Sequence, residues 1–200
     1  PRELLTKAAL RNASVVLQAI SGSTNGIVHL AAIAGRAGLS YDLDELDRLG
    51  REVPVLVNLR PAGEHFAPDF HAGGGVPALW RRLQGHLDLS ARTVGGETLG
   101  DVVARWPAYV DEDVIRPLDN PVVAGEAIAV LKGSLAPQGA VIKLAAATPA
   151  LCQHEGPALV FDSLDDLERR IDDPALDVSP DHVLVLRNAG PVGAPGMPEA

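Results

Sequence analysis

One apolar run constrains the first half of this chain more than any other stretch. Residues 53–59 read Val-Pro-Val-Leu-Val-Asn-Leu, so both faces of a strand built from them would be apolar and buried. Proline fits such a strand only at its start, where Pro54 stands. Apolar residues at helical spacing predict helices at 2–20, 27–37, 42–51, 76–87 and 99–106. This half is therefore predicted to be an α/β domain, the end of a parallel sheet covered by helices.

The pattern changes after about residue 112. Short apolar strands separated by Gly, Pro and Asn are predicted at 128–131, 140–144, 158–161 and 182–186, with one helix at 164–171. This pattern of short strands and turn residues is typical of a β-rich domain, for example a barrel or a swivelling sheet. The sequence thus predicts two domains. Residues 1–112 are the C-terminal part of an α/β domain, and residues 113–200 are the first part of a β-barrel-like domain.

The net charge, the apolar runs and the cysteine content indicate which partners and which cellular compartment to expect. A formal net charge of −9 argues against nucleic acid, whose phosphates select a basic face. No apolar run approaches the roughly 18 residues that span a membrane, and no signal peptide is visible. The single cysteine, Cys152, suits a reducing compartment, so a cytoplasmic location is expected. The chain starts at Pro1 within a helical pattern and stops at Ala200 directly after a loop. We therefore expect an internal fragment of a longer protein.

Two segments have the composition of a binding site. Small and hydroxylic residues at 21–26 lead into the apolar helix predicted at 27–37, and Ser23, Thr24 or Asn25 can cap that helix. A helix N-terminus of this kind is also a possible anion site, but the residues alone favour a plain cap. At the other end of the chain, three glycines and three prolines in residues 190–200 surround one acid, Glu199. These residues can hold a carboxylate in a fixed position, or they form a surface turn with a solvated acid.

Histidines and one acid follow the 53–59 run. His65, Asp69 and His71 lie near three consecutive glycines, beyond the carboxyl end of the predicted strand, where ligands bind in open α/β sheets. Their spacing matches no strong metal-binding pattern, so no metal is assigned to them. His29, one turn into an apolar helix, is interpreted as a core histidine.

Several segments together carry a resemblance to a known family. They are residues 21–25, 53–77, 113–121, 131–141, 156–161 and 190–199. In this order they resemble the dihydroxy-acid and sugar-acid (aldonate) dehydratase family, and they cover nearly the whole chain. The chain departs from the family's usual pattern at Ser21, where Gly is usual, at Ser134, where Asn is usual, and between residues 122 and 128, where a Gly-Gly pair is usual.

The resemblance implies a function for the full-length protein. It would be a hydro-lyase that dehydrates a 2,3-dihydroxy carboxylate to a 2-keto acid with an iron–sulfur cluster, expected to be 2Fe–2S, and Mg²⁺. The cluster cysteines would lie outside this chain, and the base serine would lie beyond Ala200. The resemblance makes Glu199 a Mg²⁺ ligand, and it places Ser23, Thr24 and Asn25 on the substrate. By itself the 200-residue chain is expected to be inactive.

The resemblance also bears on substrate and assembly. Residues 171–178 are more like the sugar-acid branch than the branched-chain amino acid biosynthetic branch. An aldonate such as arabinonate or xylonate is therefore favoured over 2,3-dihydroxy-3-methylbutanoate. The full-length protein is expected to be a homo-oligomer, a dimer or a tetramer. The alternative hypothesis is a non-catalytic α/β plus β-barrel module that binds a small anion or a protein partner.

Overall fold

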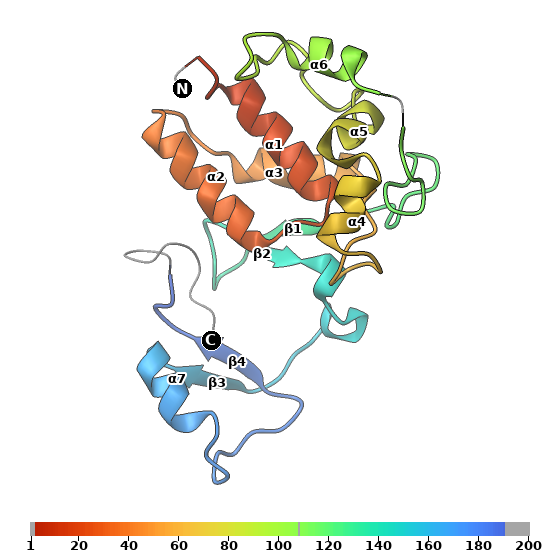
Figure 1. Cartoon of the computed structure of the whole chain (residues 1–200). Coiled ribbons are helices and arrows are strands. Elements are labelled where there is room, and N and C mark those ends of the chain that lie inside the picture. The colour runs from red at the N-terminus through yellow and green to blue at the C-terminus, as the bar shows by residue number, and fades with distance from the viewer. Residues whose placement is uncertain (1–2, 108, 191–200) are drawn as a thin grey trace. The chain divides into compact units, whose positions relative to one another are not determined.

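The chain divides into two compact units. The structure, a computed structural model, describes residues 3–107 and 109–190. The units are Pro1–Ala146 and Ala147–Ala200. The first contains α1 (Lys7–Ala19), α2 (Thr24–Arg36), α3 (Leu43–Glu52), α4 (Ala67–Ala72), α5 (Gly75–Arg82), α6 (Leu99–Arg105), β1 (Ile128–Leu131), β2 (Ala140–Lys143) and the 3-10 turn η1 (Leu144–Ala146). The second contains the 3-10 turn η2 (Pro149–Leu151), β3 (Ala158–Phe161), α7 (Leu164–Arg170) and β4 (Val183–Leu186) (Figure 1).

The core of the first unit forms on both sides of the apolar run that begins at residue 53. Val53, Leu56 and Val57 belong to one buried cluster, together with residues of α1, α3, α5 and α6. Val55 belongs to a second cluster with Ile27 and Ile128, and with Leu46 and Ala127. The prediction that this run is buried on both faces is therefore confirmed.

The bonding of this run differs from a regular strand of a parallel sheet. Val55 and Val57 form isolated antiparallel bridges with Val123 and Ile115. One carbonyl at the end of α1, that of Ala19, accepts from the N–H groups of Leu56 and Val57 at 2.8 and 3.2 Å. Helix and loop carbonyls thus supply partners that a neighbouring strand would supply. The larger architecture, a helix-covered parallel sheet joined to a β-barrel-like domain, stays a prediction.

Two helices of the first unit pack against the hairpin β1–β2. The strands pair antiparallel, from Ile128 opposite Lys143 to Leu131 opposite Ala140. Helix α3 packs on β1 and α2 packs on β2, while α1 lies beside α2 and α3 (Figure 1). The compact unit therefore extends past residue 112, and the predicted domain boundary there stays a prediction.

A buried side-chain amide on α1 joins that helix to β1. Gln18 is fully buried, its Nε2 donates to the Ile128 carbonyl at 2.9 Å, and its Oε1 accepts from the Ile128 N–H at 3.0 Å. The amide therefore satisfies both backbone groups of Ile128 on one side of β1. Gly50 of α3 permits this approach, because a Cβ there would lie 2.9 Å from the Ile128 carbonyl oxygen.

A second amide on α1 bonds in the same way. Asn12 Nδ2 donates to the Asp88 carbonyl at 2.9 Å, and Asn12 Oδ1 accepts from the Asp88 N–H at 2.8 Å. Asp47 of α3 adds a further bond to the hairpin, since its Oδ1 accepts from the Val130 N–H at 3.1 Å. Side chains from α1 and α3 therefore complete backbone hydrogen bonding that regular sheets satisfy between strands.

The second unit is a strand–helix–strand arrangement. β3 and β4 pair parallel, from Ala158 opposite Val183 to Phe161 opposite Leu186, and α7 lies between them in sequence. Phe161 is fully buried, and the Arg170 guanidinium lies 4.9 Å from the centre of its ring. Ser163 caps α7 by accepting from the Asp166 N–H at 3.2 Å. The strands predicted at 128–131, 140–144, 158–161 and 182–186 and the helix predicted at 164–171 are confirmed to within a residue.

Helix α4 is not among the helices that the sequence predicts. Its signals were Pro68 in the first turn and Asp69, whose Oδ2 accepts from the Phe66 N–H at 2.8 Å. None of the helices in the described part of the chain combines the length and the apolar character that crossing a bilayer requires.

Helix α1 ends on a strained residue. Ser21 has a φ of 48°, in the left-handed region that favours glycine. Its side chain is buried, and its Oγ has no hydrogen-bond partner within residues 3–107 and 109–190. Both the backbone conformation and the unpaired hydroxyl cost free energy of folding.

Replacing Gln18 by alanine is expected to destabilise the first unit strongly. The change leaves the Ile128 N–H and carbonyl buried without partners and opens a cavity, so we expect a loss of about 2–4 kcal/mol. Urea denaturation of the chain measures it. Gln84→Ala, at an exposed position, is the matched control and should change the free energy of unfolding by less than about 0.5 kcal/mol. Equal effects of the two changes would contradict the role given to Gln18.

Replacing Ser21 by glycine is expected to stabilise the chain by about 1 kcal/mol. Glycine adopts positive φ without strain and removes the unpaired hydroxyl, and these gains exceed its greater entropy in the unfolded state. The thermal midpoint measures the effect. Ser134→Gly, at an exposed position with ordinary φ, should be neutral or slightly destabilising. A lower midpoint for Ser21→Gly than for the parent chain would show that the positive φ is not a strain.

Candidate functional site

The loop between α1 and α2 is the best-built candidate site among the described residues. Gly22 and Gly26 lie against the side chain of Leu17, and a Cβ at either position would approach Leu17 Cδ1 to 2.4 or 2.7 Å. Any larger residue would push this side chain aside, so the two glycines let the loop pack closely on α1. The N–H of Gly22 also donates to the Leu17 carbonyl at 2.9 Å. The start of α2 is thereby held at a fixed position relative to α1.

The three residues predicted to bind substrate open α2. Ser23 is the N-cap, with an extended backbone, and its Oγ accepts from the Asn25 N–H at 3.2 Å. Ser23 is exposed, whereas Thr24 and Asn25 are half-buried in the first turn. The Thr24 hydroxyl makes no hydrogen bond within the part of the chain that the structure describes. The structure therefore brings these three residues together at one helix N-terminus.

The physical properties of this end of α2 suit an anion. The first-turn N–H groups of a helix and its dipole place about half a positive charge at the N-terminus. The first turn contains no acidic residue that would cancel this charge. A hydroxyl from Thr24 can add a donor or acceptor to a carboxylate or sugar hydroxyl bound there. The Ser23 cap is confirmed, and substrate binding at this turn stays a prediction.

The histidines and acid after the 53–59 run form no metal site. His65 Nε2 lies 3.1 Å from Asp113 Oδ2, while Asp69 caps α4 and His71 is exposed. Within the described residues, no three His, Cys, Asp or Glu side chains gather closely enough to hold a metal ion.

Other predicted positions have varied outcomes. Within the described residues His29 is exposed on α2, so they do not make it a core histidine, and they leave the apolar face on which it lies uncovered. Cys152 is an exposed free thiol. Glu199 lies outside the described residues, so its predicted role as a Mg²⁺ ligand stays a prediction.

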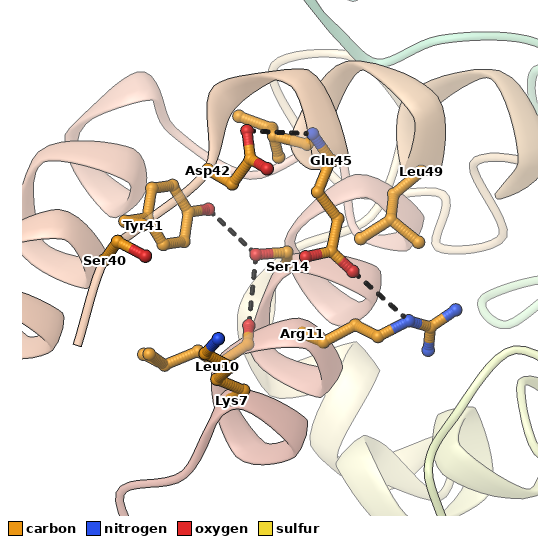
Figure 2. Close-up of a pocket in the computed structure, with 10 residues that line it drawn as sticks. Lys7, Leu10, Arg11, Ser14, Ser40, Tyr41, Asp42, Glu45 and Leu49 are labelled. Atoms are coloured by element: carbon orange, nitrogen blue, oxygen red, sulfur yellow. Dashed lines mark hydrogen bonds and ion pairs between the residues drawn. The ribbon is translucent and has the colours of Figure 1, made fainter.

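A polar cavity of about 120 Å³ lies between α1, α3 and the segment before α3 (Figure 2). The Tyr41 and Ser14 hydroxyls are 2.8 Å apart, and Ser14 Oγ donates to the Leu10 carbonyl at 3.1 Å. Arg11 Nε lies 3.6 Å from Glu45 Oε1 across the same cavity. Burial raises the pKa of the Tyr41 hydroxyl, an effect that the hydrogen bond with Ser14 opposes and the Glu45 charge reinforces. These hydrogen bonds and this ion pair join α1 to α3 and to the segment before it. Because the groups already bond one another, few of them are left to bind a ligand.

Comparison with known proteins shows which family contains these features. Residues 1–102 match the dihydroxy-acid/6-phosphogluconate dehydratase N-terminal model, and residues 113–200 match the corresponding C-terminal model. Among similar proteins, 6-deoxy-6-sulfo-D-gluconate dehydratase of Pseudomonas putida is 50% identical over an alignment of 202 positions, which covers 100% of this chain and 35% of that protein.

Two further relatives represent the two substrate branches. L-arabonate dehydratase of Azospirillum brasilense is 48% identical over 98% of this chain and 34% of that protein. Dihydroxy-acid dehydratase of Methanospirillum hungatei is 43% identical over 100% of this chain and 36% of that protein. The chain thus spans about a third of the length of the curated relatives it matches. With matches over residues 1–102 and 113–200, the chain belongs to the dihydroxy-acid/6-phosphogluconate dehydratase family.

Proposed function

We propose that the full-length protein is a hydro-lyase that converts a 2,3-dihydroxy carboxylate to a 2-keto acid. The observation that carries this proposal is the match of both family models, in order, to the two parts of the chain. In the reaction, the C2–H and C3–O bonds break and the elements of water leave. The resulting enol tautomerises to the 2-keto acid, so no external oxidant or reductant is needed.

The substrate class that we favour is a sugar acid. The relatives whose names specify sulfogluconate and arabonate are 50% and 48% identical to this chain, against 43% for the Methanospirillum dihydroxy-acid dehydratase. An aldonate such as arabinonate or xylonate is therefore the first candidate. The second is 2,3-dihydroxy-3-methylbutanoate.

In this proposal the first turn of α2 binds the anionic or hydroxylated part of the substrate. Its N–H groups and dipole attract a carboxylate, and Thr24 supplies a hydroxyl that lacks a partner within the described residues. The support is the geometry of the cap together with the resemblance of residues 21–25 to the family's segment. These residues bind and orient; none of them is assigned the proton transfer.

The cofactors of the full-length protein are also proposed, as an iron–sulfur cluster and Mg²⁺. The described residues do not fit either group by themselves, because they contain one cysteine and no cluster of three metal-binding side chains. The resemblance assigns the cluster cysteines to sequence outside this chain and one Mg²⁺ ligand to Glu199. A homo-oligomeric state is proposed on the same resemblance.

Glu199→Gln in the full-length protein is expected to lower dehydration by orders of magnitude. Glutamine keeps the size of the side chain but removes the negative charge that makes a carboxylate a strong Mg²⁺ ligand. The formation of 2-keto acid from arabinonate, xylonate and 2,3-dihydroxy-3-methylbutanoate measures activity, and elemental analysis measures bound Mg²⁺. Glu155→Gln, at an exposed position, is the matched control. Parental turnover and Mg²⁺ content in Glu199→Gln would rule out the assignment, and no turnover of any substrate by the parent would refute the proposed reaction.

Thr24→Val in the full-length protein is expected to lower kcat/KM by about 10- to 100-fold, the worth of a hydrogen bond to a charged group. Valine has nearly the same shape, so the fold should be retained, as circular dichroism can verify. Steady-state kinetics with the best substrate of the panel measures the effect. Thr148→Val, at an exposed position in the second unit, should leave kcat/KM unchanged. An unchanged kcat/KM in Thr24→Val would remove this hydroxyl from the substrate site.

A further inference from the structure

Helix α2 has the composition of a buried helix but is largely uncovered. Its sequence, TNGIVHLAAIAGR, contains one charged residue, Arg36, and no acid. A helix that is apolar around most of its circumference is normally enclosed by other elements. Among its 13 residues, however, only Ile27 and Ala34 are buried. α1 and β2 cover one side, and the face with His29, Ala32 and Ile33 is exposed.

This exposed face forms a groove. It is lined by Leu5, His29, Ala32, Ile33, Arg36, Ala37 and Gly38, and its volume is about 750 Å³. Ile33 is 42% exposed and Leu5 is 36% exposed. Apart from Leu5, which precedes α1, the lining residues belong to α2 or directly follow it, so the groove runs along the C-terminal half of α2. Apolar surface of this kind is unfavourable in water, which indicates that it packs against protein.

The length of the relatives indicates what covers it. The chain spans about a third of each of them, so a full-length family member has about twice as much further sequence. A 13-residue helix is about 20 Å long, and one face of it supplies on the order of 200–300 Å². A stable interface between separate proteins takes about 800 Å² from each partner. Packing between two segments of the same polypeptide needs no such minimum area, because the segments are already covalently linked.

We propose that the α2 groove, centred on Ile33, is the surface on which the remainder of the full-length dehydratase packs. The covering segment is apolar where it meets Ala32 and Ile33, and it carries an acid near Arg36. Because α2 begins at the Ser23 cap, packing along its C-terminal half would also fix the helix whose first turn is the candidate substrate site. The inference depends on family membership and on the exposed face, not on the proposed reaction.

A chimera tests the proposal. The 200-residue chain replaces the matching stretch of the Pseudomonas putida sulfogluconate dehydratase, to which it is 50% identical over an alignment of 202 positions. Ile33→Asp and the milder Ile33→Ala are made in the chimera and in the 200-residue chain alone. Val94→Asp and Val94→Ala, at a turn position that is 93% exposed, are the matched controls. Soluble yield, thermal midpoint and sedimentation velocity are the measurements, so the result is independent of catalysis.

The expected pattern separates the possible occupants of the groove. In the chimera, Ile33→Asp lowers the thermal midpoint by several degrees or abolishes soluble protein, and Ile33→Ala has a smaller effect in the same direction. In the chain alone, both changes leave the midpoint unaltered, because Ile33 already faces solvent. Equal midpoints for Ile33 and Val94 variants of the chimera would overturn the proposal. Dimers of the isolated chain that Ile33→Asp dissociates would also overturn it, in favour of a second copy.

Discussion

The hydrogen-bonded pair between Gln18 and Ile128 is the interaction on which the first unit most depends. An amide buried on α1 satisfies both backbone groups of a residue on β1, across 110 positions of sequence. Buried backbone groups must be paired, and a half-satisfied pair in an apolar core is costly. Ile128 belongs to the part matched by the family's C-terminal model, and Gln18 to the part matched by its N-terminal model. One side chain therefore joins the two family regions inside a single compact unit.

Other polar side chains of α1 also form hydrogen bonds with residues far along the chain. Asn12 bonds both backbone groups of Asp88, and Ser14 bonds Tyr41. The apolar residues of α1 bury surface, which is non-directional, whereas these bonds require particular partners. At its C-terminal end, the Ala19 carbonyl accepts from the buried run at Leu56 and Val57. These contacts fix the position of α1, and therefore also the position at which the following loop starts at Ser21.

The position of the candidate site follows from this arrangement. Leu17 packs on Gly22 and Gly26, which brings the Ser23 cap and Thr24 close to α1. A helix N-terminus attracts an anion but performs no elimination reaction, which needs a base and help for the leaving hydroxyl. Two observations support the proposal that other parts of a full-length protein complete the site. One face of α2 is uncovered, and the chain spans only about a third of the length of its relatives.

Local residue pattern was sufficient for most helices and for the four short strands, for the Ser23 cap and for the family, but not for α4 or for the bonding of residues 53–59. Caps, helical periodicity and short apolar runs are encoded within a few neighbouring residues. Contacts between residues far apart in the chain could not be predicted from the sequence. That a glutamine on α1 would bond Ile128, that His65 would lie beside Asp113 and that the 53–59 run would take antiparallel bridges depend on partners far along the chain. His29 is exposed within the described residues for a related reason: an apolar helix face predicts burial, but tertiary structure decides what is available to cover it. The sequence by itself thus determined the secondary structure of most segments, because those signals are local, and the tertiary structure decided which segments meet.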